Sequence, residues 1–338
     1  MDIAQIWNEW HNAKNFSGVF SARNELGVVF EECRGFRNRN ESLLNNRDTA
    51  FGIASGTKMF TGLAVCKLID DKKLTLDSRI CDLLRFDLGR IDERVTVFHL
   101  LTHTSGIGDY IDEETEDSMG QLQMLYNRYP VYLWERLEYY LPMITPLPPK
   151  FEPGARFGYS NAGYVLLGLV AEAVSGLSYQ QYVRDAVIAP CGLAHTGFYR
   201  MDALPANTAL GYMGDENGEW RTNIFNMPVI GGADGGLFTC ADDLDKLWRA
   251  VFSNKVLSEE MTKVFLKPHV SRNGDDDGCY YGLGVYINGR EDGAVYFAVG
   301  GDSGVDFFTA YVPGNKTVIS ALGNSEINTY PLLEPALR

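Results

Sequence analysis

The chain has 338 residues, of which 45% are hydrophobic and 22% are charged, and this composition is typical of a globular protein with a large core. Its 44 acidic and 30 basic residues give a formal net charge of −14, which disfavours nucleic acid and anionic membrane surfaces as partners. No basic run and no phosphate-binding glycine loop of the Walker type occurs in the sequence.

The beginning of the sequence lacks the basic start and apolar centre of a secretory signal. No apolar run of about 18 residues is present that could cross a bilayer. The six cysteines are far apart and form no C-x-x-C pair, so we expect thiols and not disulfides or metal ligands. Together these features predict a cytoplasmic protein that needs no metal or other cofactor.

The first third of the chain is expected to contain a helix over residues 3–14, strands over 18–22 and 27–32, and a helix over 55–70. In the last of these segments, apolar residues recur at helical spacing without a proline: Met59, Phe60, Leu63, Ala64, Leu68 and Ile69. Residues 109–150 are acidic, then aromatic, and end in four prolines, so we expect an irregular section closed by a loop.

Helices are predicted again over residues 165–174, from Ser178 onward, where Ser178 and Gln181 form a capping-box pattern, and over 242–252. The last quarter is strand-like over residues 281–287, 294–299, 307–312 and 317–322, because β-branched and aromatic residues alternate or cluster there. Strands at both ends and helices between them predict an α+β fold with one sheet built from both ends of the chain.

The most informative motif is Ser55-Gly56-Thr57-Lys58 at the start of the predicted helix 55–70. Residues three apart on a helix share a face, with Cβ atoms ~5–6 Å apart, so Lys58 can act as the base for a Ser55 nucleophile. The helix start also places Ser55 at the positive end of the helix dipole. By itself the motif is weak, because a capping serine followed by a solvated lysine has the same pattern.

Three further segments strengthen this interpretation. They are Leu100-Leu101-Thr102-His103-Thr104-Ser105-Gly106, Phe157-Gly158-Tyr159-Ser160-Asn161 and Gly235-Gly236-Leu237-Phe238-Thr239. In this order and spacing, the four segments resemble the serine β-lactamase and penicillin-binding-protein superfamily, most closely class C β-lactamases and their esterase and D-amino-acid peptidase relatives. The resemblance extends over residues 51–322, which is most of the chain.

The resemblance implies an antiparallel sheet flanked by helices, with a helical domain inserted in it and the active site in the seam. We place the sheet domain at residues 1–75 and 215–338, and the mostly helical insertion at residues 76–214. The implied partner is a small ester or amide substrate. The sequence does not define the oligomeric state or the natural substrate.

The resemblance also implies roles for individual residues. Ser55 would be the catalytic nucleophile and Lys58 its base, with a pKa lowered by burial. Tyr159 would share the proton relay, and Asn161 would hold Lys58 and a substrate amide. The Ser55 backbone N–H would supply one half of an oxyanion hole, a contribution of ~3–4 kcal/mol in enzymes of this kind.

A third family motif, Lys-Thr-Gly or His-x-Gly, is incomplete in this chain. The corresponding strand contains Val299-Gly300-Gly301-Asp302, in which Gly300 and Gly301 permit close approach of a substrate and the Asp302 N–H is the candidate second oxyanion donor. The basic residue of the motif is missing, because Val299 and Gly300 are uncharged. Ala298, one position before Val299, is also uncharged, so a shift of the motif by one residue does not restore it. We therefore expect an oxyanion hole but no cation on this strand to recognise a substrate carboxylate.

Other candidate sites are less convincing. His103 lies in a segment that the family uses structurally, so a structural histidine is expected there. No Gly-x-Ser-x-Gly elbow occurs, which excludes the α/β-hydrolase fold. Residues 274–278 are Gly-Asp-Asp-Asp-Gly, which lacks the ligand spacing of a calcium loop and predicts a solvated turn. No metal site is expected.

The sequence thus favours a serine hydrolase that forms an acyl-enzyme at Ser55 and hydrolyses small esters or amides, with efficient β-lactam hydrolysis ranked below both. The alternative is a non-catalytic or penicillin-binding member of the same fold that acts as a binding or interaction protein. The missing basic residue supports the alternative, whereas the presence of Ser55, Lys58 and Tyr159 opposes it.

Overall fold

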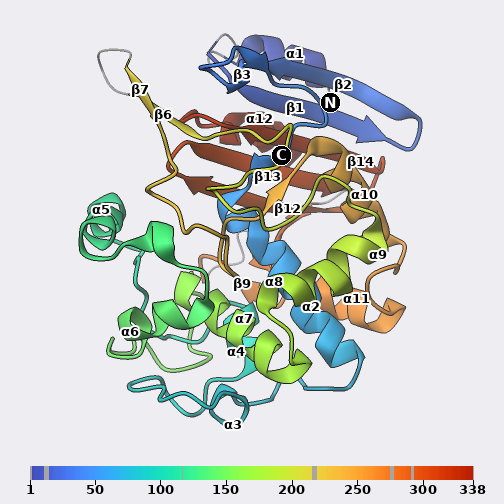
Figure 1. Cartoon of the computed structure of the whole chain (residues 1–338). Coiled ribbons are helices and arrows are strands. Elements are labelled where there is room, and N and C mark those ends of the chain that lie inside the picture. Colours follow the sequence, from blue (N-terminus) through green and yellow to red (C-terminus); the bar gives the residue numbers. More distant parts are fainter. Residues whose placement is uncertain are drawn as a thin grey trace.

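The computed structural model of the chain describes residues 2–10, 15–115, 117–214, 219–274, 278–290 and 293–337. Its largest element is an antiparallel sheet in the order β2-β1-β14-β13-β12-β11-β10-β9 (Figure 1). The strands are β2 (Gly27–Arg34), β1 (Gly18–Asn24), β14 (Thr317–Gly323), β13 (Val305–Val312), β12 (Gly293–Asp302), β11 (Tyr286–Arg290), β10 (Cys279–Tyr281) and β9 (Val270–Ser271). Because β1 pairs with β14, with Val19 opposite Leu322, the sheet is built from both ends of the chain, and the predicted α+β fold is confirmed.

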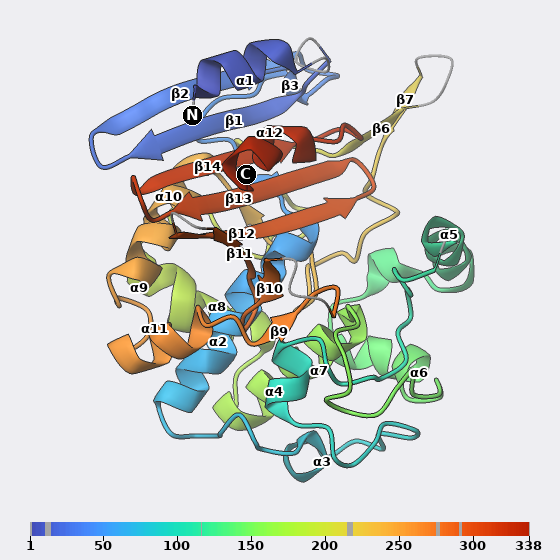
Figure 2. The same ribbon diagram turned by 180° about the vertical axis from the view of Figure 1, so that it is seen from behind.

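Helices cover both faces of this sheet (Figures 1 and 2). On one face, α1 (Ile3–Glu9) and α12 (Tyr330–Leu337) pack on strand residues that include Phe20, Phe308 and Ile319. Neighbouring residues such as Val19 and Phe307 point to the opposite face, where they join the main core. This alternation with a period of two is the expected result of burying both faces of a strand.

Two long helices form the centre of the main core. Helix α2 (Thr57–Asp70) is buried over nearly its whole length and lies beside α7 (Asn161–Ser175). The Ser160 hydroxyl caps α7 by accepting a hydrogen bond from the Gly163 N–H at 3.0 Å, and Gly176 ends the helix with a left-handed φ of 74°. These two helices carry the Ser-x-x-Lys and Tyr-x-Asn motifs at adjacent ends.

The other helices surround this pair, and small strands flank the cleft. The helices are α3 (Ile80–Leu83), α4 (Val97–Leu101), α5 (Ser118–Arg128), α6 (Leu141–Ile144), α8 (Tyr179–Val183), α9 (Ala189–Cys191), α10 (Ala241–Phe252) and α11 (Glu259–Phe265). Short turns of 3₁₀-helix are η1 (Ala54–Gly56), η2 (Val131–Leu133) and η3 (Leu137–Tyr140), and η4 (Arg184–Ile188) is π-helical. The small strands are β3 (Phe36–Asn38), β4 (Leu43–Leu44), β5 (Phe51–Gly52), β6 (Tyr212–Gly214), β7 (Trp220–Thr222) and β8 (Phe238–Thr239).

Some predicted boundaries were wrong. The first helix ends at Glu9, and residues 11–14 lie outside the described part. The section 109–150 is not a simple loop, because it forms α5, η2, η3 and α6. The predicted strand 281–287 is two strands, because Gly282 and Val285 close a turn in which Gly284 has a φ of 123°. Residues 275–277 of the predicted acidic turn are outside the described residues.

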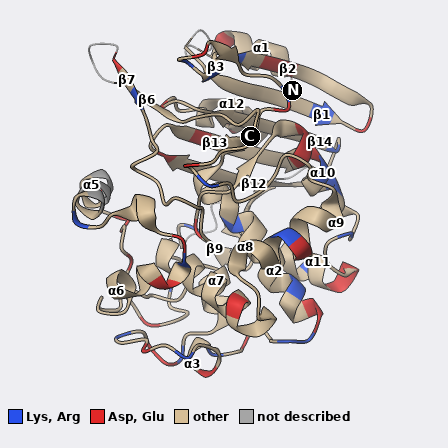
Figure 3. Cartoon of the chain, viewed as in Figure 1, with Lys and Arg blue, Asp and Glu red and all other residues tan. Residues whose placement is uncertain are grey.

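The charged residues and the cysteines are arranged as the sequence led us to expect. Acidic and basic residues are interspersed over the helices and loops (Figure 3), and all six cysteines are free thiols. Among the described residues, no single helix has the length and apolarity to cross a bilayer. In the part of the chain that the structure describes, one pair of helices, α7 and the stretch Tyr179–Cys191, reaches such a length together, with a bend of 78° between its two parts.

Candidate active site

Ser55 lies on a tight turn that presses against the sheet. The turn η1 precedes α2, so the regular helix begins two residues later than predicted, at Thr57. The residue before the serine, Ala54, has a φ of 43°, a left-handed conformation that is rare for non-glycine residues and costs about 1–3 kcal/mol. The Thr57 hydroxyl stabilises the turn by donating to the Ala54 carbonyl at 2.7 Å and accepting from the Leu237 N–H at 3.0 Å.

Lys58 is the buried centre of the site, with only 2% of its surface exposed. Its Nζ lies 3.0 Å from Ser55 Oγ, 2.7 Å from Asn161 Oδ1 and 2.7 Å from the Asp234 carbonyl oxygen. A neutral amine has two N–H groups and one lone pair. Two of these partners can only accept, so a neutral Lys58 can donate to both and accept the Ser55 hydroxyl proton.

The surroundings of Lys58 favour this neutral form. Burial lowers the pKa of Lys58, because the ammonium loses its hydration, and nearby carboxylates led by Asp234 and Glu113 partly offset the shift. The Lys58 Nζ also lies 4.9 Å from the centre of the Tyr159 ring and 5.6 Å from the centre of the Tyr164 ring. A lysine that gives up its proton readily is what a general base requires.

Tyr159 completes the group around Ser55. Its side chain hydrogen-bonds with Ser55, and burial raises the pKa of its phenol well above the ordinary value, so the hydroxyl keeps its proton near neutral pH. Its ring lies 4.4 Å from the ring of His103. His103 Nδ1 accepts the Ser160 N–H at 3.0 Å, and burial lowers the pKa of this histidine well below its usual value. His103 therefore supports the Tyr159 segment from behind.

Asn161 is held in place by two acidic side chains. Its Nδ2 donates to Glu113 Oε1 at 2.9 Å, while its Oδ1 accepts from Lys58. The Asp109 carboxylate accepts the first backbone N–H groups of α7, from Asn161 at 2.6 Å and Ala162 at 3.2 Å. Burial nevertheless raises the pKa of Asp109 to about 7. The segment after Gly108 thus fixes the orientation of Asn161 and with it the position of Lys58.

The sheet side of the site is formed by the end of β12. Strand β11 pairs with β12 only as far as Phe297, so the remainder of β12 runs past η1 without that neighbour. A Cβ on Gly300 would lie 2.2 Å from the Ile53 carbonyl oxygen and 2.9 Å from the Ser55 nitrogen, so only glycine allows this approach. Gly301 is exposed and faces open space. Gly300, Gly301 and Asp302 thus line the same cleft as Ser55, and their role in an oxyanion hole stays a prediction.

These groups surround a cleft of about 780 Å³ that contains Ser55, Tyr159 and Asn161. Its lining includes five acidic residues, namely Glu113, Asp234, Asp302, Asp306 and Glu326, and no lysine or arginine among the described residues. Asp306 already accepts hydrogen bonds from the backbone and hydroxyl of Thr329, whereas Asp302 accepts the neighbouring Ser303 N–H at 2.7 Å. The cleft walls are therefore rich in carboxyl groups, and burial raises the pKa of two of them, Asp234 and Asp306.

Three of the acidic residues around Lys58 were not identified from the sequence. Asp109 and Glu113 belong to the section 109–150, which was expected to be irregular, and Asp234 immediately precedes the segment Gly235-Gly236-Leu237-Phe238-Thr239, which was noted only for the family resemblance. Of these three residues, only Asp234 could have been found from the sequence, because it lies next to the Gly235-Gly236 segment of the family resemblance. Within the described ranges, no group of three or more His, Cys, Asp or Glu side chains could hold a metal ion.

An antiparallel sheet with a Ser-x-x-Lys turn against β12 defines the β-lactamase/transpeptidase fold. The sequence model of the Beta-lactamase family matches residues 9–335, and the chain belongs to this family. Penicillin-binding protein 4* of Bacillus subtilis (strain 168) is 27% identical over 328 residues, which cover 93% of this chain and 69% of that protein.

Solved structures support the same assignment. The penicillin-binding protein from Bacillus halodurans is 39% identical, with a TM-score of 0.90 over 99% of this chain and 98% of that one. The D-stereospecific amidohydrolase from Streptomyces sp. has a TM-score of 0.80 at 23% identity, over 99% of this chain and 98% of that chain. At this identity the second likeness concerns the fold alone.

Proposed function

We propose that this protein is a serine hydrolase that forms an acyl-enzyme at Ser55 and cleaves small esters or amides. The observation that carries the proposal is the contact of Lys58 Nζ with Ser55 Oγ at 3.0 Å, made by a lysine that is buried and has a lowered pKa. Amide-cleaving proteins occur with this fold, as the name of the Streptomyces amidohydrolase indicates.

In the first step, neutral Lys58 removes the proton of the Ser55 hydroxyl while Oγ attacks the substrate carbonyl carbon. Lys58 then carries a positive charge, which the Asn161 Oδ1 and the Asp234 carbonyl oxygen stabilise through their hydrogen bonds. The same contacts keep Nζ aimed at Oγ before the reaction. Positioning of this kind avoids a reorganisation cost in the transition state.

The negative charge that develops on the carbonyl oxygen needs hydrogen-bond donors. The Ser55 N–H lies in the first turn of η1, where backbone N–H groups have no partner within the helix. The second donor would be a backbone N–H in the Gly301–Asp302 part of β12, which lies against this turn. Tyr159, which remains protonated, would pass a proton to the leaving oxygen or nitrogen and be replenished through Lys58.

A second candidate function is that of a non-catalytic member of the same fold that acts as a binding or interaction protein. The specific observation in its favour is the absence of lysine and arginine from the described lining of the cleft, where the third motif of the family supplies a basic residue. The two candidates differ in turnover, because a non-catalytic protein cleaves no ester whether or not Ser55 is present.

The proposal is tested by covalent labelling with a fluorophosphonate, followed by peptide mass analysis. We expect one adduct, on the peptide that contains Ser55, and we expect Ser55→Ala to abolish both the adduct and ester turnover. The matched control is Ser303→Ala, which removes a hydroxyl from the lining of the same cleft and leaves the three groups that contact Lys58 Nζ in place. An adduct on another serine, or ester turnover that survives in Ser55→Ala, would refute the proposal.

A further inference from the structure

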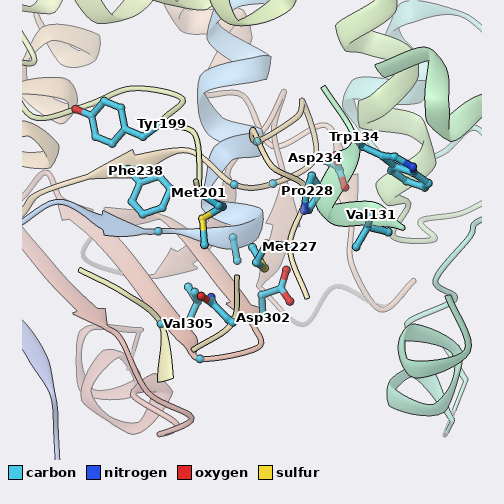
Figure 4. A pocket seen from close by; sticks show the side chains of 18 of the residues that line it. Val131, Trp134, Tyr199, Met201, Met227, Pro228, Asp234, Phe238, Asp302 and Val305 are labelled. Carbon is cyan, nitrogen blue, oxygen red and sulfur yellow. The ribbon is translucent and has the colours of Figure 1, made fainter. Parts of the chain in front are cut away.

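The hollows of the described surface differ in charge. The Ser55 cleft contains five acidic residues, and the adjoining cavity in Figure 4 shares Asp234 and Asp302 with it, so both belong to the candidate active site. Another hollow, of about 580 Å³, contains two arginines, Arg34 and Arg39, and no acidic residue in its described lining. We call it the basic groove. It shares no described lining residue with the cleft or with the adjoining cavity.

The basic groove lies between the segment that precedes β1 and the turn that follows β2. One wall is residues 15–17, and the other is residues 34–36 with Arg39. The two walls touch at Gly35, which has a left-handed φ of 69° and where a Cβ would lie 2.2 Å from Ser17 Oγ. The β6–β7 hairpin projects from the body of the molecule beside β3 (Figures 1 and 2), and it contacts Arg39.

Two aromatic side chains of this hairpin hold Arg39 in place. The Arg39 Cζ lies 4.3 Å from the centre of the Tyr212 ring and 5.6 Å from the centre of the Trp220 ring, and the two rings are perpendicular to each other. The Arg39 backbone N–H also donates to the Tyr212 hydroxyl at 2.8 Å. A guanidinium that stacks on rings keeps the N–H groups in its plane available for a ligand. Arg39 is therefore preorganised as a hydrogen-bond donor.

The positive charge of Arg39 is not compensated within the described part of the chain. Its guanidinium has no hydrogen-bond or ion-pair partner there. Burial lowers the pKa of Arg39, and among the described groups only the Tyr212 phenol partly offsets this shift. An arginine nevertheless stays charged near neutral pH. A buried or half-buried charge without a partner favours the binding of an ion of opposite sign.

The neighbouring arginines are already engaged. Residues 34–47 contain four arginines and one acidic residue, although the whole chain has a net charge of −14. Arg34 and Arg47 have carboxylate partners at 2.7 and 3.6 Å, and Arg37 donates to a carbonyl oxygen of β4. Arg39 is thus the member of this stretch that can bind an external anion.

The lining of the basic groove indicates the chemical class of that anion. The planar fork of a guanidinium matches the oxygens of a phosphate or carboxylate group. Phe36, with 38% of its surface exposed, offers an apolar surface on which a flat molecule can pack. The volume of about 580 Å³ lies within the range of about 300–1,000 Å³ that is usual for small-molecule sites.

We propose that the basic groove binds a small molecule in which a phosphate or carboxylate group is attached to an aromatic or similarly flat body. Arg39 binds the oxyanion, and Phe36 packs against the body. This site goes beyond the proposed function and does not depend on acylation of Ser55.

The proposal is tested by NMR titration of the ¹⁵N-labelled protein with phenyl phosphate, benzoate, inorganic phosphate and benzyl alcohol. We expect phenyl phosphate or benzoate to bind at least tenfold more tightly than inorganic phosphate and than benzyl alcohol. The tighter of the two identifies the oxyanion that the site prefers. The amide signal of Gly35 should move, whereas that of Gly301 in the Ser55 cleft should not.

Substitutions test the two contacts separately. Arg39→Gln should weaken binding at least tenfold, whereas Arg221→Gln, which removes the same charge from an exposed position on β7, should change it less than twofold. Phe36→Ala should weaken phenyl phosphate about fivefold and leave inorganic phosphate unchanged. Leu43→Ala on β4 is its control, because Leu43 has a similar exposure of 37% but does not line the groove.

Three results would overturn the proposal. They are equal losses in Arg39→Gln and Arg221→Gln, signal changes confined to Gly301 and its neighbours, and the absence of binding by both phenyl phosphate and benzoate. Ester turnover should be unchanged in Arg39→Gln. A failure of the proposed function therefore has a different signature, because it would abolish turnover in the parent protein and leave binding in the basic groove intact.

Discussion

The two sides of the cleft differ in how they treat charge. On the helix side, Lys58 is buried and each of its Nζ contacts is with a group that a proton relay needs. On the sheet side, β12 brings a glycine against the serine turn but contributes no cation, and its last residue is Asp302. In the proposed function, the helix side would carry the bond-making step, whereas the sheet side would select among substrates.

If the proposed function is correct, the chemical step and substrate recognition are carried by separate elements. The third motif that the family resemblance implies has a Lys or His on the strand that corresponds to β12, and here that strand is uncharged up to Gly301. The same nucleophile and base can therefore serve a different class of substrate. Substitutions on the helix side should accordingly change the rate with all substrates. Substitutions on the sheet side should change the choice among substrates.

The largest effects are expected on the helix side. Lys58→Ala and Tyr159→Phe should each lower the rate of acylation about a hundredfold or more, because each removes a member of the proton relay. The double variant should lose much less than the product of the two effects, since the groups act as one unit. The measurement is single-turnover acylation by a p-nitrophenyl ester, with circular dichroism as the check on folding. Near-parental rates in either variant would contradict the relay.

An intermediate effect is expected on the sheet side, for substrate choice. For the parent protein we expect kcat/KM to be highest for short acyl esters, lower for amine-bearing amides and lowest for penicillins. Val299 lines the cleft, and Val299→Lys should raise acylation by a penicillin about tenfold relative to a neutral ester, because a lysine can pair with the carboxylate. Val299→Gln is the uncharged control of similar length.

This prediction is contradicted if the parent protein turns over a penicillin as well as the ester at the same pH and salt. That result would mean that a carboxylate is recognised by another part of the cleft. An equal gain in Val299→Lys and Val299→Gln would show that side-chain length and not charge is responsible.

The smallest effect concerns pH. Lys58 must be neutral to act as a base, so kcat/KM for a neutral ester should rise with pH and level off above the lowered pKa of Lys58. The Glu113 carboxylate raises that pKa, so Glu113→Gln should move the rise to lower pH while its amide oxygen still accepts from Asn161. Glu326→Gln is the control. A shift of the rise to higher pH would contradict the assignment of Lys58 as the base.

Much of the fold was predictable because its signals are local or periodic. Strands β1, β2, β12, β13 and β14 follow the expected ranges closely, since alternation of side chains is visible in the sequence. The helix α5 was missed because it directly follows an acidic stretch and contains a glycine and polar residues interspersed with its apolar ones. The paired strands β10 and β11 were merged because Gly282 and Gly284 lie inside an otherwise strand-like segment.

From spacing alone, the candidate site was predictable only where residues are neighbours in sequence, whereas Tyr159, Asn161 and the residues of β12 were proposed from the family resemblance. Ser55 and Lys58 share one helical turn, so their contact follows from helix geometry. The contact between Lys58 and the Asp234 carbonyl joins segments that no local pattern connects. The same holds for Asp109, whose carboxylate reaches the start of α7 from a different part of the chain.

The pairing of β1 with β14 has a consequence for synthesis of the protein. The hairpin β1–β2 leaves the ribosome long before β14, and the edge of β1 stays open until residues near Leu322 have been translated. An open strand edge is prone to associate with other chains. The wall beside Ser55 is also made late, since β12 belongs to the last part of the sheet to be synthesised. A nascent or truncated chain would therefore have Ser55 and Lys58 but no completed cleft, so acylation of Ser55 should become possible only after the last strands have docked.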